Sequence, residues 1–262
     1  MRNLILRGAA ALVAAGLLAV PALSAQCSSS GANYEKWKAQ FAAEAKANGV
    51  SAKAISALMS TSYATKTIYA DRHQHSFKLS LSAFMQKRGA STIVAQGRRL
   101  KAANAGLFKS IEAKYGVPAG PLIAIWGMET GFGRVTGNQP TLAAVATLAY
   151  DCRRTDYFTD QLYAALKLVD RGVLSASTRG AMHGEIGQTQ FMPKNVLAYG
   201  GGGNLASKES ALTSTARFLV GHGWKRGAGY QPGQPNFGAI QGWNAATVYQ
   251  QAIAIMGKQI DG

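Results

Sequence analysis

Near its middle the chain reads Val117-Pro-Ala-Gly-Pro-Leu-Ile-Ala-Ile-Trp-Gly-Met-Glu129-Thr-Gly-Phe-Gly-Arg134. This run is apolar except at its end, where Glu129 stands between small and apolar residues. Pro118 and Pro121 suit the approach to a helix and its first turn, and Gly131 suits the helix end. We therefore expect a helix over residues 122–129 with a carboxyl group in its last turn.

In such a helix Glu129 shares a face with Leu122, Ile125 and Trp126, which precede it by seven, four and three positions. Burial and the negative end of the helix dipole both disfavour the carboxylate, so the pKa of Glu129 should be raised. A raised pKa suits a carboxylic acid that donates a proton near neutral pH. The alternative is a structural carboxylate, in solvent or paired with Arg134, and the placement alone leaves both open.

Helical periodicity also dominates the rest of the chain. We expect helices at residues 34–48, at a short turn capped by Ser51, and at 91–115, 141–150, 156–171, 211–222 and 245–258. Residues 200–203 and 227–238 are loops by their glycine content. Strand signals are few, which predicts a mainly α fold with few or no short strands.

The N-terminus is typical of a secretory signal peptide. Arg2 and Arg7 flank the start of an apolar run over residues 8–23, which ends in small residues before Ala25. The alternative, a membrane anchor, would need about 20 predominantly apolar residues. We expect residues 1–25 to be the signal peptide and one domain of 237 residues to follow, at 26–262.

Two cysteines, Cys27 and Cys152, remain after export. In an oxidising compartment such a pair favours one disulfide, with two independent thiols as the alternative. A lipid anchor on Cys27 is disfavoured, because Gln26 occupies a position where lipoprotein signals carry a small residue. The histidines are scattered and no Cys-x-x-Cys or His-Glu-x-x-His pattern occurs, so we expect no metal and no cofactor.

The chain is strongly basic, with 28 Lys plus Arg against 12 Asp plus Glu. Loss of the signal peptide lowers the formal charge from +16 to +14. For an exported protein the nearby polyanions are cell wall and anionic lipid head groups. The basic residues are dispersed as pairs such as Arg98-Arg99 and Lys225-Arg226, without a helical stripe. This pattern argues against a nucleic-acid partner.

Two further clusters carry polar side chains among glycines and aromatics. The first is Gly184-Glu-Ile-Gly-Gln-Thr-Gln190-Phe-Met-Pro193, and the second is Gly242-Trp-Asn-Ala-Ala-Thr-Val-Tyr249. In the first, the amides could bond sugar hydroxyls, and Phe191 offers apolar surface for a pyranose face. The alternatives are an ordinary glycine turn before a helix near Pro193 and a terminal helix that packs on a core.

Together these segments resemble the lytic murein transglycosylases of the membrane-bound B type, which have a lysozyme-like catalytic domain with a substrate cleft. The resemblance runs from about Tyr34 to the C-terminus in the family's order. It rests on these motifs: Ala124-Ile-Trp-Gly-Met-Glu-Thr-Gly-Phe-Gly133, Leu142-Ala-Ala-Val-Ala-Thr-Leu-Ala-Tyr150, Arg153-Arg154-Thr-Asp-Tyr-Phe158, Gly187-Gln-Thr-Gln-Phe-Met-Pro193, His222-Gly-Trp224 and Trp243-Asn244 with Tyr249.

The resemblance implies that Glu129 is the sole catalytic acid and base. It implies substrate or cleft contacts for these residues: Gln190, Asn244, Tyr249, Tyr157, Arg153 and Arg154. Two departures from the family pattern stand out. Ala181 replaces a small hydroxyl residue nine positions before the glutamine, and the Tyr199–Asn204 loop lacks the carboxylates of a calcium site.

The implied reaction cleaves peptidoglycan between N-acetylmuramic acid and N-acetylglucosamine without water and leaves 1,6-anhydromuramoyl ends. A hydrolytic muramidase would need a second carboxylate, for which the candidates are Glu185, Asp151, Asp156 and Asp160. Asp156 suits the N-cap or first turn of the following helix. Glu185 lies in a glycine loop, where a carboxylate that simply faces water is the alternative to a second site carboxylate. A non-catalytic wall-binding or scaffolding protein is the alternative from another class. The resemblance also implies that the protein is exported to the bacterial periplasm, is monomeric, and makes peripheral contact with the cell wall or membrane.

Overall fold

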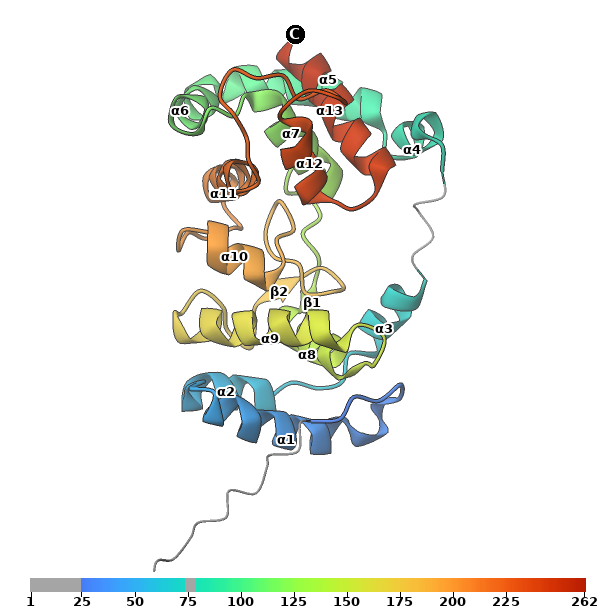
Figure 1. Cartoon of the computed structure of the whole chain (residues 1–262), viewed down its shortest axis with the longest axis vertical. Helices are drawn as coiled ribbons and strands as arrows, with labels where there is room; N and C mark the ends of the chain where they lie inside the picture. The colour runs from blue at the N-terminus through green and yellow to red at the C-terminus, as the bar shows by residue number, and fades with distance from the viewer. Residues whose placement is uncertain (1–24, 74–78) are drawn as a thin grey trace, which may run out of the picture.

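The computed structural model describes residues 25–73 and 79–262, so the predicted signal peptide lies outside the described residues except for Ala25. The fold is mainly helical (Figure 1). The helices are η1 Gly31–Asn33, α1 Tyr34–Ala47, α2 Ala52–Met59, α3 Thr65–Arg72, α4 Leu81–Lys87, α5 Ala90–Ala103, α6 Ala105–Tyr115, α7 Ala119–Thr130, α8 Thr141–Tyr150, α9 Thr155–Asp170, α10 Pro193–Tyr199, α11 Lys208–Gly221, α12 Phe237–Trp243 and α13 Thr247–Asp261.

The helices form two groups that are joined through the middle of the molecule (Figure 1). At one end α1 and α2 pack beneath α8 and α9, and at the other end α13 packs against α7 and α5. Between the groups lie α10, α11 and two short antiparallel strands, β1 Gln139–Pro140 and β2 Arg179–Gly180. The prediction of few or no short strands is confirmed for the described residues.

Helix α7 is the central element of the upper group. It starts after Pro118 and ends at Gly131, which adopts the left-handed conformation with φ 57°, as the proline and glycine positions predict. Every α7 residue except Glu129 is buried, so this helix is covered on all sides. A Cβ atom on Gly120 would lie only 2.1 Å from the carbonyl oxygen of Gly257, so α7 and α13 approach backbone to backbone.

The predicted single helix over residues 91–115 is wrong in one respect. The structure breaks it at Asn104, whose φ of −123° separates α5 from α6. The side chain of Asn104 donates a 2.8 Å hydrogen bond to the carbonyl oxygen of Leu100 and accepts one from Lys208. Asparagine readily bonds to nearby backbone in this way and so competes with helix continuation.

Three short helices, α3, α4 and α12, were not expected from the sequence. Helix α12 begins at Phe237, inside the glycine-rich segment predicted as a loop. The fully buried Asn236 precedes it and donates two 2.8 Å hydrogen bonds, to the carbonyl oxygens of Lys225 and Ala228. These bonds, to residues 11 and 8 positions away, order the segment and leave no signal in local periodicity.

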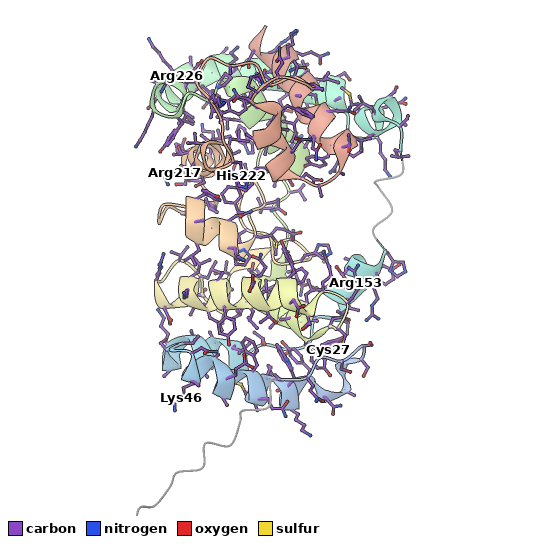
Figure 2. The ribbon with its side chains drawn as sticks, in the orientation of Figure 1. Cys27, Lys46, Arg153, Arg217, His222 and Arg226 are labelled. Atoms are coloured by element: carbon purple, nitrogen blue, oxygen red, sulfur yellow. A yellow bond between two sulfur atoms is a disulfide. The ribbon has the colours of Figure 1, made fainter. Side chains whose placement is uncertain are left out.

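The N-terminal end of the described chain is fastened to the corner between α8 and α9. Cys27 and Cys152 form a disulfide with a Cα–Cα distance of 5.0 Å. The amide of Ser28 also donates a 3.0 Å hydrogen bond to the carbonyl oxygen of Tyr150. Figure 2 shows Arg153 beside α3 with Cys27 beneath it, so this corner lies next to the arginine pair.

Candidate active site

Glu129 lies in the last turn of α7 and accepts two hydrogen bonds on the same oxygen. The indole nitrogen of Trp243 at the end of α12 lies 2.9 Å from Oε1 of Glu129. The hydroxyl of Tyr249 on α13 lies 2.7 Å from the same atom. Neither of these two hydrogen bonds involves Oε2, so they leave that oxygen of Glu129 available for other contacts.

The environment sets the protonation of this carboxyl. Burial raises the pKa of Glu129, and the charge of Glu185 raises it further. The hydrogen bonds from Trp243 and Tyr249 and the charge of Arg88 lower it. Burial is the largest effect, and the pKa of Glu129 is raised overall. This agrees in direction with the pKa expected from the apolar helix end. Burial, together with the neighbouring Glu129 carboxyl, also holds the pKa of Tyr249 well above its usual range, so the tyrosine remains a donor.

Glu129 opens onto a cavity of about 380 Å³. Six of the residues predicted for the site line it: Glu129, Arg154, Tyr157, Gln190, Phe191 and Asn244. Tyr249 contacts Glu129 but is buried behind it, and Arg153 is not part of the lining. The structure therefore brings segments from α7, α9, the loop before α10, and the end of α12 to one cavity.

Gln190 has a strained backbone in this cavity. Its φ of 56° lies in the left-handed region, which costs a residue other than glycine of order 1–3 kcal/mol. Its side-chain nitrogen donates to the carbonyl oxygen of Gly187 at 2.8 Å and to that of Thr136 at 3.3 Å. With the nitrogen engaged, the amide oxygen is the atom available to a ligand.

The two arginines are held by a buried carboxylate of α3. Arg153 Nε donates a 2.6 Å hydrogen bond to Oδ2 of Asp71, and Arg154 also pairs with Asp71. Burial alone would raise the pKa of Asp71, but both guanidinium groups lower it below its usual value. Arg154 stacks over the ring of Phe158 with its guanidinium carbon 4.8 Å from the ring centroid. Arg154 is therefore fixed at the edge of the cavity, whereas Arg153 contacts Asp71 and does not line the cavity.

Glu185 lies at the cavity rather than in open solvent. Its side chain is 23% exposed and lines the same cavity as Glu129. The backbone amide of His183 donates a 2.9 Å hydrogen bond to Oε2 of Glu185, and Nδ1 of His183 lies 3.1 Å from Oε1. Asp156 does lie in the first turn of α9, as predicted.

Phe191 differs from its predicted role as an open sugar-stacking surface. It is 1% exposed, and its ring packs 5.4 Å from the ring of Trp243 and 6.0 Å from that of Phe218. It therefore supports the tryptophan that bonds to Glu129. Tyr157, in contrast, is 49% exposed and presents its ring at the cavity.

Sequence reasoning missed Gln188 and the role of Trp243. The Gln188 side chain accepts a 2.9 Å hydrogen bond from the indole of Trp126 and donates one of 2.6 Å to the carbonyl oxygen of Ala206. Thr130 also donates to the Gln188 carbonyl oxygen at 2.6 Å. These bonds hold the loop before α10 against α7. The aromatic residue next to Asn244 was visible in the sequence, but its hydrogen bond to a residue 114 positions away was not.

The described ranges contain no group of three or more His, Cys, Asp or Glu side chains placed to hold a metal ion. The Tyr199–Asn204 loop lies beside a different cavity, of about 560 Å³, which is lined by Arg171 and Arg179 among others.

Comparison with known families identifies this arrangement. Residues 33–233 match the model of the transglycosylase SLT domain, which is most of the chain. The chain belongs to the transglycosylase SLT domain family. A stretch of 137 residues is 35% identical to the membrane-bound lytic murein transglycosylase B of Escherichia coli K12, and covers 47% of this chain and 38% of that protein. This alignment thus spans well under half of the curated relative.

Solved transglycosylases share the fold of this SLT domain. SltB3 from Pseudomonas aeruginosa, solved in complex with NAG-anhNAM-pentapeptide, is 26% identical and superposes with a TM-score of 0.80 over 88% of this chain and 80% of its own. The Escherichia coli lytic transglycosylase Slt35, in complex with bulgecin A, gives 0.73 at 22% identity over 90% and 96% of the two chains, a likeness of fold alone. The predicted family and lysozyme-like helical fold are confirmed.

Proposed function

We propose that this chain is a lytic murein transglycosylase that cleaves the β-1,4 bond between N-acetylmuramic acid and N-acetylglucosamine and leaves 1,6-anhydromuramoyl ends. The observation that carries the proposal is the placement of Glu129: a carboxyl with a raised pKa, two donors on one oxygen, and a cavity of about 380 Å³ in front of it. The SLT family is one of peptidoglycan-cleaving enzymes.

Glu129 acts first as the general acid. Trp243 and Tyr249 occupy Oε1, so Oε2 carries the proton and delivers it to the oxygen that links the two sugars. As the bond from that oxygen to the muramoyl C1 breaks, the 2-acetamido oxygen of the same sugar stabilises the positive charge at C1. The raised pKa of Glu129 keeps the proton available near neutral pH.

Glu129 then acts as the general base. Its carboxylate, stabilised by the two donors, takes the proton from the muramoyl C6 hydroxyl. The C6 oxygen bonds to C1 and releases the acetamido group, which closes the 1,6-anhydro ring without water. Because one residue both donates and accepts the proton, neither the carboxylic acid nor the carboxylate of Glu129 can be strongly favoured. Burial favours the acid and the two hydrogen bonds favour the carboxylate, so the two effects oppose each other.

The substrate is the glycan strand of peptidoglycan. SltB3, the relative at 26% identity, was solved with NAG-NAM-pentapeptide and with NAG-anhNAM-pentapeptide, and the second ligand carries the anhydromuramoyl end that the proposed reaction leaves. We assign sugar contacts to Gln190 through its amide oxygen, to Tyr157 through its exposed ring, and to Asn244 and Arg154 at the cavity wall. Tyr249 and Phe191 support Glu129 and Trp243 from behind.

The product identifies the reaction. Purified peptidoglycan sacculi digested with the protein should give anhydromuramoyl fragments by mass spectrometry, 18 Da lighter than reducing-end fragments because no water is added. Glu129→Gln should fold normally, bind sacculi and release no fragments. Glu209→Gln, an exposed glutamate on α11, is the matched control and should behave as wild type. Full activity of Glu129→Gln would refute the proposal.

Hydrolysis is the second candidate, because Glu185 supplies a second carboxylate at the same cavity. A muramidase would use it to activate water. The engagement of both Glu185 oxygens with His183 disfavours this role. Reducing muramic ends in the same digest would establish hydrolysis, and binding without any fragments from the wild type would point to a non-catalytic wall-binding protein.

We place the activity in the bacterial periplasm, with a monomeric protein exported by its N-terminal segment. Across the described parts of the chain no helix has both the length and the apolar character needed to cross a membrane. The excess of basic residues suits peripheral contact with the anionic wall or membrane surface. Fractionation of cells that express the full chain tests this location.

A further inference from the structure

Glu185 is a second carboxylate of the active-site cavity with no part in the proposed chemistry. It lies in the loop between β2 and α10, far in sequence from Glu129, and both side chains line the same space. Both of its oxygens are fixed by His183, at 2.9 Å through the backbone amide and at 3.1 Å through the ring. A carboxylate clamped at both oxygens cannot easily serve as a nucleophile or move towards water.

An ion cluster around the buried Asp71 lies next to this clamp. Nε2 of His183 lies 3.7 Å from Oδ1 of Asp71, which Arg153 and Arg154 hold from the start of α9. Burial alone would raise the pKa of Glu185, but the His183 hydrogen bonds and imidazole outweigh it and lower that pKa. Glu185 is therefore negatively charged throughout the neutral range.

Several charged and titratable groups surround Glu129. Arg88, at the end of α4, favours the carboxylate of Glu129, and so do the two donors, Trp243 from α12 and Tyr249 from α13. On the other side of the balance, the negative charge of Glu185 favours the protonated form of Glu129, as the smallest of these effects. Three more titratable side chains line the cavity from α9 and the β2–α10 loop: Arg154, Tyr157 and His183.

We propose that Glu185 is a positioning residue that acts through Glu129: its clamped negative charge keeps the proton on Glu129 until the glycosidic oxygen takes it. This inference rests on the proposed function, because it presumes that Glu129 is the acid. A fixed anion opposes the attraction of Arg88, and repulsion between like charges in a partly enclosed cavity is stronger than in water. The His183 clamp keeps that charge at a constant distance during the reaction.

The test is the pH profile of Glu185→Gln. Glutamine keeps the shape of the side chain and an oxygen that accepts the bond from His183, but removes the charge. We expect the alkaline limb of kcat/KM for anhydro-fragment release to move to lower pH, because Glu129 then loses its proton sooner. On that limb the variant should be about three- to tenfold less active than wild type, with a smaller loss at its optimum. Glu209→Gln should leave the limb in place.

A carboxyl-carbon NMR titration of Glu129 gives a readout that needs no turnover. In Glu185→Gln the titration midpoint of Glu129 should fall, and a melting temperature near that of wild type would show that the fold is intact. A wild-type midpoint and an unmoved limb would overturn the inference, while inactivity of Glu129→Gln would still sustain the proposed function. Activity of Glu129→Gln, in contrast, would remove the proposed function itself.

Discussion

The hydroxyl of Tyr249 lies 2.7 Å from Oε1 of Glu129, although 120 residues of chain separate them. The contact depends on the close packing of α13 on α7, where Gly120 meets the backbone of Gly257. Tyr249 donates to the carboxylate and so opposes the effect of burial on its pKa. The docking of the last helix thus contributes to the acid strength of Glu129.

Removal of the Tyr249 hydroxyl should destabilise the carboxylate of Glu129 relative to its protonated form. In Tyr249→Phe the pKa of Glu129 should rise further, because burial is then opposed by one donor fewer. The alkaline limb of the pH profile should move to higher pH, opposite to the shift expected for Glu185→Gln. We expect kcat to fall about ten- to hundredfold, since the carboxylate is the base of the second step. Tyr69→Phe, at an exposed tyrosine of α3, is the control. A limb that moves to lower pH would contradict this account.

Gln188→Ala should destabilise the fold. The substitution leaves the buried indole nitrogen of Trp126 and the carbonyl oxygen of Ala206 without their partners. We expect the free energy of unfolding to fall by about 1–3 kcal/mol, measured by urea denaturation. Gln86→Ala, at an exposed site on α4, should change it by no more than about 0.5 kcal/mol. Equal effects of the two substitutions would show that the Gln188 bonds contribute little.

Asp71 should make stability depend on pH in the acidic range. Its pKa is lowered in the folded protein by Arg153 and Arg154, so the unfolded chain binds the proton more readily. The stability that the ionised Asp71 contributes is fully present above the pKa of Asp in the unfolded chain, about 3.9. It is lost as the pH falls towards the lower pKa of Asp71 in the folded protein.

Asp71→Asn should therefore flatten the acidic part of the stability curve and lower the free energy of unfolding at pH 7 by about 1–3 kcal/mol. The partner arginines are partly exposed, which keeps the cost below that of a fully buried pair. Asp160→Asn breaks the exposed pair with Lys194 and should cost less than about 0.5 kcal/mol. Unfolding curves at pH 3 to 7 provide the measurement. If the free energy of unfolding of Asp71→Asn depended on acidic pH as steeply as that of the wild type, other groups would cause the acid sensitivity.

The disulfide should stabilise the domain without taking part in the reaction. It joins residues 125 positions apart and restricts the unfolded chain. In the double variant Cys27→Ser/Cys152→Ser we expect the free energy of unfolding to fall by about 2–4 kcal/mol. A thiol reductant should lower the stability of the wild type by a similar amount and leave the double variant unchanged. Sensitivity of the double variant to reductant would contradict the assignment.

Local patterns predicted helices where an apolar stretch is continuous or where a glycine ends it. The predicted range 141–150 is the same as that of α8, and Gly131 ends α7. The break at Asn104 was missed, because an asparagine between two amphipathic stretches has the same periodicity as one continuous helix. Helix α12 was missed because its order depends on side-chain bonds of Asn236 that periodicity does not reveal.

The site was predictable in part. Glu129 could be singled out because a carboxyl at the end of an apolar helix is unusual in any sequence. The burial of Phe191 could not, since it depends on distant elements that meet at its ring. The clamp on Glu185 could not either, since it depends on how its own loop folds. Nothing in the composition of a glycine-rich loop distinguishes a glutamate in water from one bonded to His183.

The order of these elements along the chain limits how the domain can be shortened. The family match ends at residue 233, before α12 and α13 begin. A fragment cut at that boundary would contain Glu129 but neither Trp243 nor Tyr249. Its acid would lack both donors, and α7 would lose the helix that covers it. Any excised or transplanted version of this catalytic unit must extend through α13, and fusions at the C-terminus need a linker that leaves that helix free to dock.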